Sequence, residues 1–159
     1  MGSEWGQFLE WKFDHALEWV DLNDPMNQQM QTYTAHLNQL YKEERAFWEN
    51  DYGIETIRWI DDNSEESTLS FIRQGKRKKD FVIVVVNLVP VERLNFSLAV
   101  PFEGEYQEVL NTEMAEFGGT WKVGNDSCQT QEHSFKNFSH QITIHLPALA
   151  VLYFKPTKI

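Results

Sequence analysis

The chain has 159 residues, a formal net charge of −10 and a single cysteine. An acidic surface repels phosphate backbones, so nucleic acid is not expected as a partner. No apolar run approaches the roughly 20 residues that cross a bilayer, so no membrane contact is expected. Cys128 can form no disulfide within the chain, and residues 1–10 lack the features of a signal peptide. We therefore expect a cytoplasmic protein.

Residues 1–22 carry many aromatic side chains among acidic ones, and their spacing fits neither a strand nor a regular helix. The apolar members are Trp5, Phe8, Trp11, Phe13, Leu17, Trp19 and Val20. This segment has no layer of its own in which to bury these side chains. We therefore expect it to line or cover another part of the protein.

A helix is expected next. Asp24 is a favourable N-cap residue, and Pro25 suits the first helical position. Over residues 26–48 the apolar side chains recur every three or four residues, as on one face of an amphipathic helix. The turn residues at 50–53 end this pattern. The apolar face of the helix needs a partner.

The stretch 81–86 is apolar throughout and mostly β-branched, which is typical of a strand covered on both faces. We expect it to be a central strand, with residues 69–72 and 94–100 as its neighbours. Alternating patterns and frequent turn signals mark about seven short strands from residue 52 onward, which predicts an antiparallel β-sandwich. Residues 111–138 are polar and contain glycines, so they are expected to be mostly loop, with room for one strand.

Acidic side chains near the N-terminal tryptophans raise the question of a glycosidase-type pair, which needs two carboxyl groups facing one bond. These side chains are Glu4, Glu10, Asp14 and Glu18. Nearness in sequence does not bring two carboxyl groups face to face, so a solvated surface is the simpler interpretation.

The histidines and the cysteine give no clear sign of a metal or cofactor site. His140 and His145 are an odd step apart on an expected strand, so they point to opposite faces. Cys128 lies in a polar stretch without a neighbouring base, so an ordinary thiol is expected rather than a nucleophile. Neither a metal nor another cofactor is predicted.

Trp59 alternates with other residues near the start of the expected sandwich, beside a turn rich in Asp and Asn. It is either a core residue or an exposed ring on which a sugar could stack. The exposure of the ring decides between the two.

Five short motifs occur in order along the chain. They are MGSEWGQ at 1–7, LNQLY at 37–41, EVLNT at 108–112, FGG and GN within 117–125, and LPALA at 146–150. Together they resemble the C-terminal part of bacterial 1,4-α-glucan (glycogen) branching enzymes, from the exit of the eighth barrel strand to the closing strand pair of the β-domain. Two departures are visible. The family usually has Asn-Phe-Thr-Pro where residues 87–90 read Asn-Leu-Val-Pro, and Trp where Tyr106 stands.

The resemblance implies a (β/α)8 barrel followed by a β-sandwich. Residues 1–51 would be the tail of the catalytic barrel, a loop plus its last helix, and residues 52–159 the C-terminal β-sandwich domain of the alpha-amylase family type. The catalytic carboxylates of the family lie on earlier barrel strands, so no catalytic residue is expected here and the isolated chain is expected to be inactive. The full protein would transfer α-1,4-glucan segments to 6-hydroxyls by retaining chemistry, with α-glucan and the barrel as partners.

The same resemblance suggests substrate-binding residues. Glu4, Trp5 and Gln7 would lie near the rim of the active-site cleft, because barrel sites form at the C-terminal ends of the strands. Trp11 would line the cleft or pack beneath it, and Trp59 would be an auxiliary glucan contact. Two alternatives remain at this point: a purely structural β-sandwich, and a free-standing carbohydrate-binding module. The exposure of Trp59 tests the first, and the packing of residues 1–22 tests the second.

Overall fold

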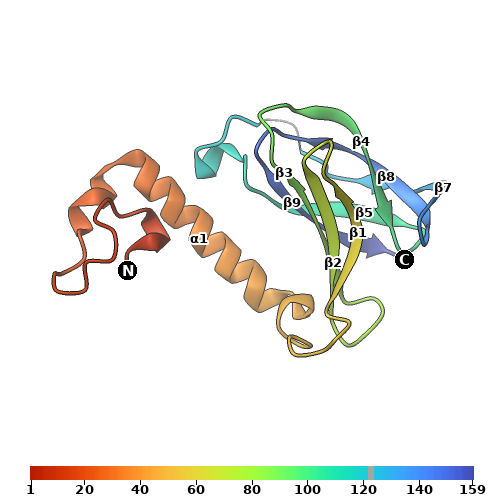
Figure 1. The fold of residues 1–159 in the computed structure, drawn as a ribbon, viewed down its shortest axis with the longest axis horizontal. Coiled ribbons are helices and arrows are strands. Elements are labelled where there is room, and N and C mark those ends of the chain that lie inside the picture. Colours follow the sequence, from red (N-terminus) through yellow and green to blue (C-terminus); the bar gives the residue numbers. More distant parts are fainter. Residues whose placement is uncertain (122–123) are drawn as a thin grey trace.

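The computed structural model describes residues 1–121 and 124–159 (Figure 1). Its helical elements, with η marking a 3-10 helix, are η1 (Ser3–Trp5), η2 (Trp19–Asn23), α1 (Pro25–Glu43), η3 (Arg45–Phe47) and η4 (Ala115–Phe117). Its strands are β1 (Ile57–Asn63), β2 (Thr68–Gln74), β3 (Phe81–Asn87), β4 (Arg93–Val100), β5 (Glu105–Asn111), β6 (Cys128–Gln129), β7 (Gln131–Phe135), β8 (Phe138–Leu146) and β9 (Val151–Lys158). Within the described residues, no helix is long and apolar enough to cross a membrane.

The strands form two antiparallel sheets packed as a sandwich (Figure 1). The larger sheet has the order β1-β2-β3-β9-β5-β6, and the smaller has the order β4-β8-β7. Their inner faces share one core, and its fully buried side chains include Phe81, Ile83, Leu98, Tyr106, Ile142, Ile144, Leu152 and Phe154. The prediction of a mainly β fold, with an antiparallel sandwich preceded by a helix, is confirmed.

Strand β3 is covered on both faces, as its composition predicted, but one of its two expected neighbours was wrong. It pairs with β2 and β9, whereas β4 pairs with β8 in the other sheet. Ile83 and Val85 belong to the sandwich core, while Val82 and Val84 pack with Ala46 on the outer face. An apolar stretch shows that a strand is covered but does not show which strands lie beside it.

The stretch between β5 and β8 contains more structure than its sequence predicted. It holds η4 and two short strands, β6 paired with β5 and β7 paired with β8, where at most one strand was expected. Strand β7 is almost entirely exposed, so no apolar alternation marks it. Lys122 and Val123, which belong to the same stretch, lie outside the described residues.

Helix α1 begins where its cap predicted. The Asp24 Oδ1 atom accepts a hydrogen bond from the Met26 N–H at 2.8 Å, and Pro25 is the first helical residue. The helix ends at Glu43 instead of continuing to residue 48, and η3 follows. In η3, Phe47 packs on the outer face of the larger sheet and its carbonyl accepts a hydrogen bond from Arg73 Nη2 at 2.8 Å. Contacts with the sheet thus replace the last expected helical turn.

Candidate functional site

The segment before α1 is fastened to the first half of that helix. The Asn27 Nδ2 atom donates to the carbonyls of Trp5 (2.7 Å) and Gly6 (3.1 Å), and the Thr34 hydroxyl donates to the carbonyl of Glu4 (2.9 Å). Figure 1 shows this segment, in red, on the side of α1 away from the sandwich. Sequence reasoning missed the buried Asn27. Its burial could have been suspected from the sequence, because Asn27 lies three residues before Met30 and therefore on the same face of the helix.

Two of the predicted substrate-binding residues hold this segment together. The Trp5 ring is only 5% exposed and stacks on Trp19, with ring centroids 4.8 Å apart. The Gln7 side chain donates to the carbonyl of Leu9 (2.8 Å) and accepts from the N–H of Glu18 (3.0 Å). Both side chains therefore position the loop, and their contact with glucan stays a prediction.

The remaining apolar side chains of the segment are largely solvent-exposed. Trp11 is 77% exposed, and this group, here called the N-terminal apolar set, consists of Phe8, Trp11, Phe13, Trp19 and Val20 of the segment, together with Met26 at the start of α1. Large exposed apolar side chains gathered on one segment are typical of a surface that binds another protein part or a ligand. Glu4, Glu10 and Asp14 are exposed among them, as a solvated acidic surface requires.

Trp59 is an exposed residue of an edge strand. Its ring is 58% exposed and lies against Phe71, its partner across the β1–β2 pair, with ring centroids 5.6 Å apart. A shallow pocket of about 370 Å³ lies beside this aromatic pair, lined by Phe71, Tyr41, Phe47 and Tyr153 among others. The interpretation of Trp59 as a core residue is therefore wrong, because more than half of its surface is open to solvent.

The five predicted substrate-binding residues do not form one site within this chain. Glu4, Trp5, Gln7 and Trp11 belong to the segment before α1, and Trp59 belongs to β1, with α1 between the two (Figure 1). These residues therefore belong to two separate surfaces of the chain.

A partly buried polar cluster joins β5, β8 and the loop before β6. The Asn125 Nδ2 atom donates to Glu108 Oε2 (2.6 Å) and to the carbonyl of His145 (3.0 Å), while its Oδ1 atom accepts from the His145 N–H (2.7 Å). Burial raises the pKa of Glu108. Burial, with the charges of Glu108 and Asp126, raises the pKa of Cys128 to about 11. The buried thiol stays protonated at neutral pH, which suits packing rather than nucleophilic attack.

Along its whole length, the chain is similar to proteins named 1,4-alpha-glucan branching enzyme GlgB. It is 41% identical to that of Lactobacillus acidophilus and 43% identical to that of Lactiplantibacillus plantarum, in both cases over 100% of this chain. It is 37% identical to that of Halothermothrix orenii over 98% of this chain. In each comparison the chain spans about a quarter (25%) of the relative's length.

A profile of the family described as "Alpha amylase, C-terminal all-beta domain" matches residues 59–157, well over half of the chain. The chain belongs to this family. The alpha-amylase C-terminal all-beta domain thus extends from β1 to β9, while the GlgB relatives also match the helix and the segment before it. A solved structure of a MutB mutant, from crystals soaked with trehalulose, shares the fold with a TM-score of 0.50 and 14% identity, covering 90% of this chain and 20% of that one. The resemblance to branching enzymes inferred from the five motifs is confirmed.

Proposed function

We propose that this chain is the C-terminal part of a 1,4-α-glucan branching enzyme, which moves α-1,4-glucan segments onto 6-hydroxyls. The observation that carries this proposal is the similarity to GlgB proteins from the first residue to the last, including the segment outside the alpha-amylase C-terminal all-beta domain. The relatives are about four times longer than this chain, so the catalytic carboxylates are assigned to the part that this chain lacks. A cytoplasmic location is part of the same proposal.

Residues 1–51 are proposed to complete a catalytic barrel, and residues 52–159 to be the separate β-sandwich. The N-terminal apolar set supports this division, since side chains such as Trp11 and Phe13 would lose solvent exposure against a barrel. The junction is held from the sandwich side, where Lys155 Nζ pairs with Glu44 Oε1 at 2.5 Å and Arg73 binds the carbonyl of Phe47. In a free-standing carbohydrate-binding module, nothing would cover the N-terminal apolar set.

The proposal is tested by a chimera. The matching quarter of the Lactiplantibacillus plantarum relative is replaced with this chain, and α-1,6 linkages formed from a linear α-1,4-glucan are counted by NMR. We expect the chimera to branch the glucan at a rate within about tenfold of the intact relative. The reason is that the side chains that contact the rest of the enzyme are replaced by related ones and are not removed. This chain alone should form no α-1,6 linkages. A folded chimera without branching activity, or branching by the chain alone, would contradict the proposal.

Trp59 is proposed as an auxiliary glucan contact, because its exposed ring and Phe71 present an aromatic surface beside a shallow pocket. Trp59→Ala should weaken the affinity of the chain for glycogen about tenfold, the loss expected for one stacking platform. Gel retardation in glycogen-containing gels measures this. Trp48→Ala is the matched control, because Trp48 is 44% exposed but lies outside the β1–β2 pair that carries Trp59 and Phe71. Unchanged retardation of the Trp59 variant would rule out Trp59 as a glucan contact.

A further inference from the structure

We propose that the cleft between the β1–β2 hairpin and the strands β4 and β7 is a second binding site, which takes a short, neutral α-glucan segment. The cleft has a volume of about 380 Å³, at the lower end of the range for ligand pockets. The choice of α-glucan as the ligand rests on the proposed function. The residues of the cleft are distinct from those assigned to glucan above.

The cleft lies on the opposite face of β1 from Trp59. Ile60 and Ser70 line it and are 2% and 3% exposed, so they form its inner wall. Successive side chains of a strand point to opposite faces, and Trp59 accordingly lies against Phe71 on the outer face. The two surfaces can therefore be changed independently.

The lining combines groups that suit both parts of a sugar. Its uncharged polar and aromatic members include Asn95, His133, Gln141, Phe96 and Phe135. Amide side chains both donate and accept hydrogen bonds, as sugar hydroxyls require of their partners. Phenyl rings offer flat apolar faces to the C–H faces of a sugar ring. A lining with both features in about 380 Å³ fits a short oligosaccharide better than a purely apolar ligand.

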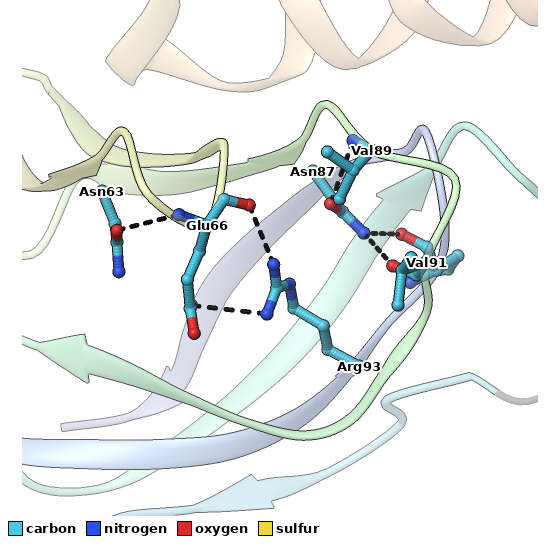
Figure 2. A network of polar contacts seen from close by, with 7 residues as sticks. Asn63, Glu66, Asn87, Val89, Val91 and Arg93 are labelled. Carbon is cyan, nitrogen blue, oxygen red and sulfur yellow. Dashed lines mark hydrogen bonds and ion pairs between the residues drawn. The ribbon is translucent and has the colours of Figure 1, made fainter.

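The charged side chains Asp61, Glu66 and Arg93, which line the cleft, are already ion-paired. Arg93 Nη2 donates to the carbonyl of Glu66 (2.8 Å), and Arg93 Nη1 lies 3.4 Å from the Glu66 carboxylate, as Figure 2 shows. The carboxylate of Asp61 accepts a hydrogen bond from Lys136 Nζ at 2.7 Å. The Asn63 Oδ1 atom accepts from the Glu66 N–H (3.1 Å) and fixes the turn (Figure 2).

This pairing decides the class of ligand. An anion or a cation entering the cleft would meet side chains whose charges are already balanced, so it would gain little. Among residues 1–121 and 124–159, no group of three or more His, Cys, Asp or Glu side chains could hold a metal ion. A neutral polyhydroxy ligand does not disturb the ion pairs, and lining side chains that are already held by partners lower the entropic cost of binding it.

The test is an NMR titration of the isotope-labelled 159-residue chain with maltotetraose. We expect chemical-shift changes at Asn95, His133 and Gln141 that saturate below about 10 mM, the range of weak specific binding. Asn95→Ala and Gln141→Ala should each weaken binding at these signals about tenfold, by removal of a hydrogen-bonding amide. The control is Asn38→Ala, which repeats the substitution made at Asn95 at an exposed position of α1.

Three outcomes would overturn the inference: no shift changes in the cleft, changes confined to the surroundings of Trp59 and Phe71, or equal affinity in the two cleft variants and the control. Folding of each variant is checked by the dispersion of its own amide spectrum. The readout is binding by this chain, so it is independent of branching. An inactive chimera together with a saturable cleft would reject the proposed function and leave this inference standing.

Discussion

Replacing Asn87 with alanine should lower the free energy of unfolding of the sandwich by about 3 kcal/mol, because it leaves buried backbone groups without partners. Asn87 is 1% exposed at the end of β3. Its Nδ2 atom donates to the carbonyls of Val91 (2.8 Å) and Pro147 (2.7 Å), and its Oδ1 atom accepts from the Val89 N–H (3.3 Å). Figure 2 shows the two hydrogen bonds that the Asn87 amide nitrogen donates.

These bonds explain why an asparagine ends the central strand. They tie the β3–β4 connection, which crosses from one sheet to the other, to the turn between β8 and β9. Each buried group that loses its partner costs about 1 kcal/mol or more, and alanine also leaves a small cavity. The departure from the branching-enzyme pattern at residues 88–89 leaves this function of Asn87 intact, since two of the three bonds involve its neighbours' backbone.

Urea unfolding followed by tryptophan fluorescence and far-UV circular dichroism measures the effect of Asn87→Ala. Asn38→Ala, on the exposed side of α1, is the control and should change the free energy of unfolding by less than about 0.5 kcal/mol. A loss below about 1 kcal/mol for Asn87→Ala would mean that water replaces these bonds and that the strand end does not depend on them.

Trp5→Ala should release the segment before α1 without lowering the stability of the sandwich. A buried tryptophan replaced by alanine costs about 3 kcal/mol or more, which corresponds to roughly a hundredfold faster exchange of the amides it protects. Trp5 is 5% exposed and its ring stacks on Trp19, whereas the bond from Asn27 of α1 goes to the Trp5 backbone carbonyl and is kept in the variant. The loss should therefore appear in residues 1–24, and the strands should keep their protection.

Hydrogen exchange read by mass spectrometry measures this local opening. Trp11→Ala is the matched control, since the same substitution at a ring that is 77% exposed removes little packing. Faster exchange in β3 or β9 after Trp5→Ala would contradict the division into residues 1–51 and 52–159. Equal exchange in the Trp5 and Trp11 variants would show that the stacked ring does not hold the segment.

The local elements could be predicted because their signals are local. The Asp24–Pro25 pair gave the start of α1, since a cap acts on the N–H groups immediately after it. The apolar stretch of β3 predicted a strand covered on both faces. The order of the five motifs indicated the branching-enzyme relatives. These features need only the chemistry of residues a few positions apart.

The sequence by itself therefore determined the class of fold, the start of the helix and the family. Only the tertiary structure decided that β9 and not β4 lies beside β3, and that Trp5 is buried while Trp59 is exposed. It also decided that the side chains of Asn27, Asn87 and Asn125 are buried and hydrogen-bonded to other segments of the chain. The physical reason is that pairing and burial depend on groups far apart in the chain. Asn87, for example, binds Pro147, and periodicity within one segment carries no information about such a partner.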